Sequence, residues 1–529
     1  MSRLIKSSGA VAVATLISRI LGFARESAYA GFMGTGFVAD CFLFALQVPN
    51  LFRRLLGEGA LTAAFVPIFK AQEAKADATS MWRGANAVIS GLLLVSAVLI
   101  ALVLLGLTIA IHWLPMTAKN ELIASLLRWM FPYVGLACLA AVFIGILNAR
   151  GHFFLPALGT AILSLVMIGS VYFLAPLFGV EKWEQVYGLA AGLVLAGLLQ
   201  AAVQLPSLWR EGFRYRWVNP WRDPTVKQVL RKMAPATIGV AAYQINVMLT
   251  AMIALHSGER IISSFNYAVR LMELPQGVVG VSLATYLLTE LSHLAVAKKF
   301  PEFRATLREG MQQLIFINGL ATVLLLVLAE PMIRLLFQHG VFHDRDTRLT
   351  SIALRCLAPG LLAFSLNNIV ARAFYALGDT RTPMVISVSC LGLNLALGFS
   401  LIPAFQQAGM GIANSLSAIA NTGLLFYALR RALPKFSLVD MGPNVASVLG
   451  AAIAAAVTAW MGNQQWERWI GHAHFLQRFG AVFAPLTLAT LVYFALASWM
   501  KLPQARELFL TFRGLMGKRI KPVFPPTSN

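Results

Sequence analysis

The sequence predicts an all-α polytopic membrane protein with about fourteen transmembrane helices. Hydrophobic residues make up 58% of the 529-residue chain and charged residues only 12%, whereas a soluble protein carries about 25% charged residues. The mean hydropathy is +0.71. Apolar stretches of about 20 residues, the length of a bilayer-spanning helix, recur from end to end. These observations predict no large soluble domain.

The apolar stretches follow one another along the chain. The first comes after a basic start, MSRLIKSSGAVAVATLIS, whose composition is that of a signal peptide. Because the apolar pattern continues without a clear cleavage site, we expect an uncleaved first helix. The expected spans are 8–33, 36–69, 85–113, 122–147, 155–178, 186–208, 228–254, 262–289, 310–337, 349–376, 383–403, 409–430, 444–462 and 479–500.

The formal net charge is +21, which in a soluble protein would suggest a nucleic-acid ligand. Here the basic residues alternate with the spans. They gather at the N-terminus, at 70–84, at 209–232, and in KKFPEFRATLRE, RRALPK and the tail RGLMGKRIK. The other loops are short or poor in Lys and Arg. This positive-inside pattern predicts cytoplasmic termini, basic loops that face anionic membrane lipids, and no nucleic-acid partner.

An internal repeat divides the chain. ARGHFFLP at 149–156 and ALGDTRTP at 376–383 share the frame A-x-G-x4-P, and FLFALQV at 42–48 resembles FNYAVRL at 265–271. The offset is about six spans, which preserves orientation, so we expect two pseudo-symmetric six-helix bundles around a central cavity that work by alternating access. We predict an N-terminal six-helix lobe at 1–215 and a C-terminal six-helix lobe at 216–435. Two additional helices and a basic cytoplasmic tail follow at 436–529.

Ionised residues within the spans indicate a candidate site, because a charge in hydrocarbon is costly. Arg19, Arg25 and Arg53 have no obvious partner at helical spacing. Glu26 directly follows Arg25 and is expected to point elsewhere. Asp40 is a candidate for a gate pair with an arginine in one conformational state.

Other intramembrane charges stand three or four residues apart and can pair on one helix face. The pairs are Arg54 with Glu58, Arg270 with Glu273, and Glu330 with Arg334. Such a pair can be purely structural, and we expect this of Glu330 with Arg334. Arginine dominates the whole set and lysine is absent from it. Because the guanidinium fork grips phosphate with two parallel hydrogen bonds, the set favours a phosphate- or diphosphate-bearing substrate.

At these residues the sequence resembles a known family. The stretches SRILGFARE, ADCFLFALQVPNLFRRLLGEGALTAAFVPIF, YAVRLMELPQGVVGVSLAT and FYALGDTRTP are similar to those of the MurJ/MviN lipid II flippases. These belong to the multidrug/oligosaccharidyl-lipid/polysaccharide exporter superfamily. The resemblance extends over about residues 1–435.

The resemblance implies a substrate and a set of site residues. The substrate would be lipid II, the undecaprenyl-diphosphate disaccharide-pentapeptide of peptidoglycan synthesis, moved from the cytoplasmic to the periplasmic leaflet of the bacterial inner membrane. The family's cavity arginines match Arg19, Arg25, Arg53 and Arg270, and its acidic and polar companions match Asp40, Asn50, Glu58, Ser263 and Glu273. The family often has Asp where this chain has Glu26. Arg54 is expected to support the site by pairing with Glu58.

The drive for transport is left open by the sequence. Some members of the family resemble sodium-coupled exporters that use carboxylates in three of their spans. The matching spans here contain no Asp or Glu, and their nearest polar candidates are Asn246, Asn394 and Asn421. We therefore expect no cofactor, an unknown coupling ion at most, and the membrane potential as the drive.

Three alternatives to a lipid flippase stay open. A drug or small-ion exporter of the same superfamily would depend on carboxylates rather than arginines. An integral-membrane enzyme would need a sizeable outside loop with clustered acidic residues or a metal site, whereas the outside loops offer only GER and HDRDTR. A scaffold for other cell-wall synthesis proteins would not need buried arginines. We therefore expect a transporter, not an enzyme, acting as a monomer.

The cysteines and histidines predict no metal site. Cys41, Cys138, Cys356 and Cys390 all fall within expected spans without paired spacing, and we expect them to be small buried residues. The histidines at 339, 343, 472 and 474 lack clustered cysteine or carboxylate companions, so metal binding is a minor alternative.

Overall fold

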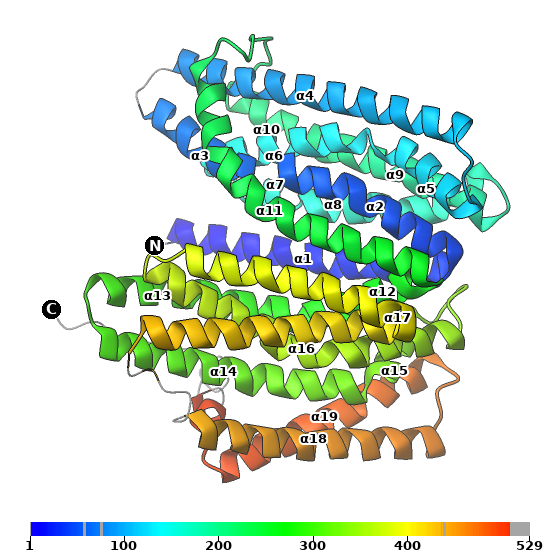
Figure 1. Ribbon diagram of the computed structural model, residues 1–529, viewed down its shortest axis with the longest axis vertical. Coiled ribbons are helices and arrows are strands. Elements are labelled where there is room, and N and C mark those ends of the chain that lie inside the picture. Colours follow the sequence, from blue (N-terminus) through cyan, green and yellow to red (C-terminus); the bar gives the residue numbers. More distant parts are fainter. Residues whose placement is uncertain (1, 57–59, 75–77, 435, 437–440, 508–529) are drawn as a thin grey trace. The chain divides into compact units, whose positions relative to one another are not determined.

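The computed structural model describes residues 2–56, 60–74, 78–434, 436 and 441–507, and within these it is built from helices (Figure 1). The chain forms two compact units. The N-terminal unit comprises the chain up to Ser263 together with His339–Asp346, and the C-terminal unit comprises the rest. The lobe boundaries expected at 215 and 435 stay a prediction.

The N-terminal unit contains eleven α-helices among its described residues. They are α1 (Ser2–Met33), α2 (Phe37–Leu56), α3 (Ala60–Glu73), α4 (Ala78–Trp113), α5 (Ala118–Met130), α6 (Tyr133–Ala149), α7 (Phe154–Ala157), α8 (Gly159–Gly169), α9 (Lys182–Ala202), α10 (Leu205–Arg210) and α11 (Pro224–Ser257), with a π turn at Ser170–Leu174 and a 3₁₀ turn at Ala175–Phe178.

Two helices begin in the N-terminal unit and continue into the C-terminal one: α12 (Ile261–Pro275) and α16 (Asp344–Ala376). The remaining helices belong to the C-terminal unit. They are α13 (Val281–Val296), α14 (Phe300–Val327), α15 (Ala329–Phe337), α17 (Arg381–Ala432), α18 (Gly442–Trp469) and α19 (Phe475–Trp499), with a π turn at Gln276–Gly280 between α12 and α13.

The helices have the length and apolarity of membrane spans. Seven helices of the described chain pass this test alone, and nine do if two bent helix pairs each count as one span. The prediction of an all-α polytopic membrane protein is confirmed. The count of about fourteen spans stays a prediction, because several expected spans are broken into shorter helices.

The longest of these elements, α17, joins two expected spans. Its backbone leaves the helical conformation at Gln406, where φ is 50° and ψ is −120°. The predicted spans 383–403 and 409–430 meet at this residue. A Cβ on Gly409 would lie 2.1 Å from the carbonyl oxygen of Leu401, so the tight turn at this point requires glycine.

The internal repeat reappears as local backbone structure within each unit. After α6, Gly151 has a φ of 87°, and the His152 N–H donates to the Leu147 carbonyl at 2.8 Å. After α16, Gly378 has a φ of 83°, and the Asp379 N–H donates to the Phe374 carbonyl at 3.0 Å. This hydrogen bond is that of a helix C-terminus ended by a left-handed glycine. The two copies of A-x-G-x4-P therefore make the same turn.

The last two helices contribute to the core of the C-terminal unit. Small residues of α18 and α19, among them Ala455 and Ala489, are buried in the same cluster as Phe316 of α14. The buried Tyr493 hydroxyl donates to the Phe316 carbonyl at 2.7 Å. The other faces of these helices expose large apolar side chains such as Leu449 and Leu491. The pair is thus fixed to its unit on one side and apolar on the other, as expected of lipid-facing additions.

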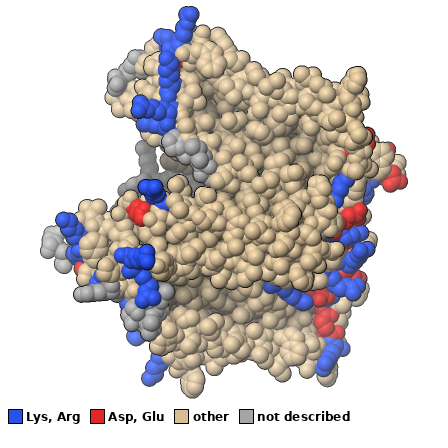
Figure 2. All heavy atoms as spheres, viewed as in Figure 1, with Lys and Arg blue, Asp and Glu red and all other residues tan. Residues whose placement is uncertain are grey.

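Charged side chains lie near the helix ends rather than along the helix surfaces. In Figure 2 the surface of each unit is tan between its ends, with mostly Lys and Arg at the left end and charges of both signs intermixed at the right end. A broad uncharged surface between charged ends is typical of proteins that span a bilayer.

Candidate functional site

Arg25 lies on α1 and, among the residues that the structure describes, makes one ion pair. Its Nη2 donates to Glu26 Oε1 at 2.6 Å, and its guanidinium carbon lies 5.7 Å from the centroid of the Tyr29 ring. Glu26 is only 3% exposed, whereas Arg25 is 20% exposed. The expectation that Glu26 points away from Arg25 is wrong. The arginine side chain is long enough to fold back onto the next residue when both are withdrawn from water.

The other arginines of the N-terminal unit differ in exposure. Arg53 is half-buried near the end of α2, with Asn50 one turn before it, and the adjacent Arg54 is exposed. Arg19 is exposed on α1. Glu58, the expected partner of Arg54, lies outside the described residues, so that pair stays a prediction.

Asp40 is buried in the first turn of α2 and holds the start of α12. Its Oδ2 accepts from the Arg260 N–H at 2.6 Å. Its Oδ1 accepts from the Ser263 N–H at 2.8 Å and from the Ser263 hydroxyl at 2.6 Å. The first N–H groups of a helix have no partner within it and favour negative charge. The Asp40 carboxylate is therefore an N-terminal cap supplied by another helix.

The end of the preceding helix is capped by the opposite charge. Lys119, at the start of α5, donates through Nζ to the Leu255 carbonyl of α11 at 2.6 Å. The carbonyls at a helix C-terminus have no intrahelical partner and favour a cation. A lysine and an aspartate thus fix the turn between α11 and α12 from its two sides.

The side chain of Arg260 forms the next part of this cluster. Its Nη1 donates to Asp346 Oδ1 at 2.7 Å and to the Thr35 carbonyl at 3.0 Å. The Thr35 hydroxyl also donates to Asp346, whose Oδ2 accepts from the His343 N–H at 2.9 Å. Asp40 therefore contacts the main chain of an arginine, while the guanidinium pairs with Asp346. We call Thr35, Asp40, Arg260, Ser263 and Asp346 the Asp40 cluster.

Close backbone contacts hold the 339–346 segment against the end of α1. The Val341 N–H donates to the Gly31 carbonyl at 3.0 Å. A Cβ on Gly340 would lie 2.1 Å from the Gly31 carbonyl oxygen, and one on Gly31 would lie 2.5 Å from the His339 ring. Glycine is required at position 340, where φ is +60° and the close atom is backbone, whereas a side chain at position 31 would displace the His339 ring.

Arg270 and Glu273 lie on α12 within the C-terminal unit. Arg270 Nη1 donates to Glu273 Oε2 at 2.9 Å, and the two side chains are 38% and 51% exposed. The i,i+3 pairing predicted from the sequence is present. A salt bridge this exposed contributes little to stability where it meets water.

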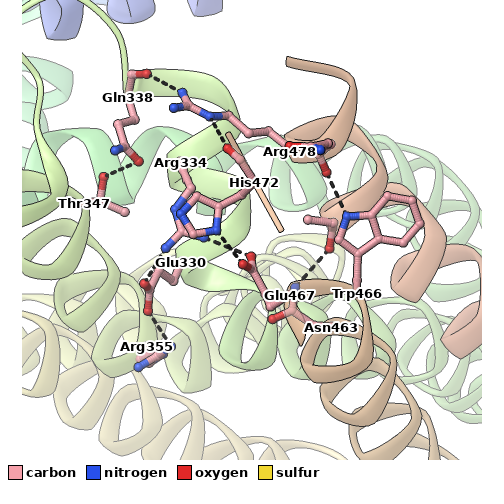
Figure 3. Close-up of polar contacts among 12 residues, drawn as sticks. Glu330, Arg334, Gln338, Thr347, Arg355, Asn463, Trp466, Glu467, His472 and Arg478 are labelled. Atoms are coloured by element: carbon pink, nitrogen blue, oxygen red, sulfur yellow. Dashed lines mark hydrogen bonds and ion pairs between the residues drawn. The ribbon is translucent and has the colours of Figure 1, made fainter. Parts of the chain in front are cut away.

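A polar network joins helices of the C-terminal unit at one end (Figure 3). Arg334 of α15 pairs with Glu330 at 2.9 Å and with Glu467 of α18 at 3.0 Å. His472 Nδ1 also lies 2.5 Å from Glu467. Arg334 is 11% exposed. With two carboxylates on one guanidinium, the contacts fit the structural role expected for Glu330 and Arg334.

Arg478 of α19 extends this network. Its Nε donates to the His472 carbonyl at 3.0 Å and its Nη1 to the Gln338 carbonyl at 2.8 Å (Figure 3). Glu330 lies 3.8 Å from Arg355 of α16. The network therefore ties α18 and α19 to α15 by directional contacts in addition to apolar packing.

A third charged cluster lies at the end of the N-terminal unit formed by α3, α6 and α10. Arg150 donates through Nε to Glu211 Oε2 at 2.6 Å and through Nη1 to Glu73. His152 lies 2.7 Å from Glu211. Hydrogen bonds from His152 and Arg150 lower the pKa of Glu211, and those from Lys70 and Arg150 lower the pKa of Glu73. The hydrogen bond to Glu211, followed by that to Glu73, raises the pKa of Arg150.

The structure thus joins some of the predicted site residues directly. Arg25 with Glu26, Asp40 with Ser263, and Arg270 with Glu273 are in contact. Arg260 and Asp346 were missed as site residues. Their signal was present in the sequence, because they belong to the charged loop stretches GER and HDRDTR.

Comparison with known proteins decides the family. A family model described as lipid II flippase MurJ matches residues 29–480. The chain belongs to this family. The family is one of transporters, which excludes the enzyme alternative, and the chain is a multi-pass membrane protein.

Curated relatives agree along nearly the whole chain. A probable lipid II flippase MurJ of Vibrio cholerae is 34% identical over 440 residues, covering 81% of this chain and 83% of the relative. A probable lipid II flippase MurJ of Haemophilus influenzae is 33% identical, covering 90% of this chain and 96% of the relative. The lipid II flippase MurJ of Burkholderia cenocepacia is 32% identical, covering 91% and 94%.

Solved structures confirm the fold. A lipid II flippase MurJ in an inward closed conformation superposes with a TM-score of 0.76 at 21% identity, covering 96% of this chain and 99% of that one. An inward-facing multidrug-resistance MATE family transporter gives a TM-score of 0.64 at 16% identity, covering 79% and 96%. These matches show that the chain shares its fold with both transporters.

Proposed function

We propose that this chain flips lipid II from the cytoplasmic to the periplasmic leaflet of the bacterial inner membrane by alternating access. The family membership and the names of its relatives support the substrate. The fold shared with a flippase in an inward closed conformation supports the mechanism. The positive-inside pattern supports cytoplasmic termini.

The observation that carries the chemistry is Arg25. It lies in a membrane helix with one carboxylate contact, that to Glu26, and its Nε is buried without a hydrogen-bond acceptor. Glu26 offsets one positive charge but engages only one nitrogen of the fork. The remaining N–H groups suit a diphosphate, which offers several anionic oxygens. Arg19, Arg53 and Arg270 would complete the anion-binding set, and the polyprenyl tail would stay in lipid.

The Asp40 cluster would serve the conformational cycle. Asp40 holds the first turn of α12, and α12 carries Arg270 and Glu273 further along. A carboxylate cap of this kind can be released and remade as α12 moves relative to α2, because each hydrogen bond is individually modest. Asp40 and Ser263 would therefore gate the site, while Glu273 would hold Arg270 in place until substrate arrives.

The energy source and the assembly state complete the proposal. We propose the membrane potential as the drive, since moving one charge across 100 mV is worth about 2.3 kcal/mol. We propose that the chain acts as a monomer alongside other cell-wall synthesis proteins.

The test is complementation of cells depleted of their own lipid II flippase, with surface-exposed lipid II measured in parallel. The wild type should restore both growth and surface lipid II. Arg25→Ala, Arg53→Ala and Arg270→Ala should reach the membrane at normal levels and restore neither. Arg128→Ala is the matched control, because this exposed arginine of α5 is not among the predicted site residues, and it should restore both. Full activity of the three arginine variants would reject the diphosphate site and favour a drug or small-ion exporter.

A further inference from the structure

The loop between α10 and α11 follows the first turns of α4 within the N-terminal unit. Phe213 packs on Trp82 with ring centroids 5.7 Å apart. Asn86 Nδ2 donates to the Arg214 carbonyl at 3.0 Å, and Ser90 Oγ lies 3.2 Å from the Tyr215 hydroxyl. Residues 82, 86 and 90 are four apart and lie on one face of α4. The loop therefore runs lengthwise along this helix.

The length of α4 places this loop beside the lipid headgroups. The helix has 36 residues, or about 54 Å at 1.5 Å per residue, whereas the hydrocarbon core of a bilayer is about 30 Å thick. The first turns of α4 carry Arg83 and Asn86, whereas the run that follows is apolar, so it is this end that extends beyond the hydrocarbon. The loop that covers those turns lies at the level of the headgroups.

The side chains that the loop turns outward are aromatic and basic. Trp209, Tyr215, Trp217 and Trp221 are 51%, 48%, 61% and 65% exposed. Exposed basic residues alternate with them and continue onto the first turns of α11: Arg210, Arg214, Arg216, Arg222, Lys227, Arg231 and Lys232. The basic cluster at the upper left of Figure 2 lies over these ends of α4 and α11. Tryptophan and tyrosine favour the membrane interface, and clustered Lys and Arg favour anionic lipids.

The acidic residues of the same stretch are already engaged. Glu211 accepts from Arg150 at 2.6 Å. Asp223 caps α11 by accepting from the Thr225 N–H at 2.9 Å. In the part of the chain that the structure describes, no carboxylate pairs with Arg216 or Arg222. The outward charge of the loop is therefore positive and available to a ligand.

We propose that residues 209–232 form a binding surface for anionic phospholipid headgroups, distinct from the transport site. The arginines bind the lipid phosphates, and the exposed tryptophans insert between neighbouring headgroups. The surface needs no particular membrane orientation and does not depend on what the protein transports. A soluble acidic protein is the competing ligand, but it would not require tryptophans at the level of the membrane interface.

The test is a titration of the full-length protein in a neutral detergent with short-chain phosphatidylglycerol, against phosphatidylcholine of the same chain length. Bound lipid is counted by native mass spectrometry. The wild type should prefer phosphatidylglycerol, and added salt should weaken the preference. Arg216→Gln with Arg222→Gln should lower affinity at least tenfold, since each basic residue near a membrane surface contributes about fivefold. Trp217→Ala should weaken binding with the arginines intact.

The matched control removes the same charge from another basic loop. Lys298→Gln with Lys299→Gln changes two exposed residues of the C-terminal unit and should lower phosphatidylglycerol binding far less than the arginine pair does, because the stretch KKFPEFRATLRE carries no tryptophan. Because all these side chains are exposed, the thermal unfolding midpoints should agree, which shows that the variants fold. Equal binding by the arginine variant and the wild type would overturn the proposal. So would an equal loss in the control, or binding of polyglutamate but not lipid.

Discussion

Arg25 and Arg334 both lie in predicted membrane spans and both pair with glutamate, yet their surroundings differ. Arg334 is held by Glu330 and Glu467, one from its own helix and one from α18 (Figure 3). Arg25 has one carboxylate, from the adjacent residue, and is more exposed, 20% against 11%. Both arginines keep a buried Nε without an acceptor, but Arg334 uses both of its terminal nitrogens on carboxylates and Arg25 uses one. Arg25 therefore keeps more donors for a ligand.

The difference shows that charge in a span does not by itself identify a binding residue. The number of carboxylates that an arginine meets is the better guide. It predicts opposite behaviour on substitution: loss of stability at Arg334, and loss of transport at Arg25.

The largest effect on stability is expected for Arg334→Ala. The substitution removes the cation that Glu330 and Glu467 share, which should lower the free energy of unfolding by about 3 kcal/mol. Thermal unfolding in detergent would measure it, and transport per folded molecule should remain. An unchanged unfolding midpoint would show that the network in Figure 3 is not structural.

Arg25→Lys should separate transport from stability. Lysine keeps the positive charge beside Glu26 but loses the planar fork, so the unfolding midpoint should stay the same while lipid II flipping falls at least tenfold, or about 1.4 kcal/mol. Arg334→Lys is the control and should lower the midpoint without lowering transport per molecule. The same phenotype in both variants would remove the distinction between the two arginines.

Ser263→Ala should have a smaller effect than Asp40→Ala. Removing the Ser263 hydroxyl takes one of three hydrogen bonds from the Asp40 carboxylate, which should cost about 1 kcal/mol. Removing the carboxylate leaves the first turn of α12 without its cap, which should lower the free energy of unfolding by about 2 kcal/mol. Unfolding in detergent compares the two, and equal losses would mean that the main-chain bonds to Asp40 contribute nothing.

The smallest effect is expected at the Arg150 cluster and should depend on pH. Glu73 and Glu211 have lowered pKa values in the folded state. Their contribution to the free energy of unfolding is therefore fully present above the ordinary glutamate pKa of about 4.3. It is lost as the pH falls through their lower folded-state pKa values. Arg150→Gln should be about 0.5 kcal/mol less stable than the wild type at pH 7, because the pair is partly exposed. The difference should shrink towards pH 3, and a gap that widened in acid would reverse the assigned sign.

The sequence predicted most of the helical architecture and part of the site. Apolar runs and the A-x-G-x4-P frame were sufficient, because they depend on local hydropathy and on backbone conformation at single glycines. The i,i+3 pair of Arg270 with Glu273 was predictable for the same reason. Arg260 and Asp346 were not identified as site residues, because their contact joins segments far apart in the chain. The contact between Arg25 and Glu26 also depends on burial, which adjacency in sequence does not reveal.

The most direct measurement is equilibrium binding of undecaprenyl diphosphate to the purified full-length protein, compared with the uncharged alcohol of the same chain length. The account predicts that the wild type prefers the diphosphate and that Arg25→Lys reduces the preference at least tenfold. Arg128→Lys, at an exposed arginine of α5 outside the predicted site, should leave it unchanged. If Arg25→Lys bound both lipids as the wild type does, the claim that the intramembrane arginines recognise a diphosphate would be contradicted.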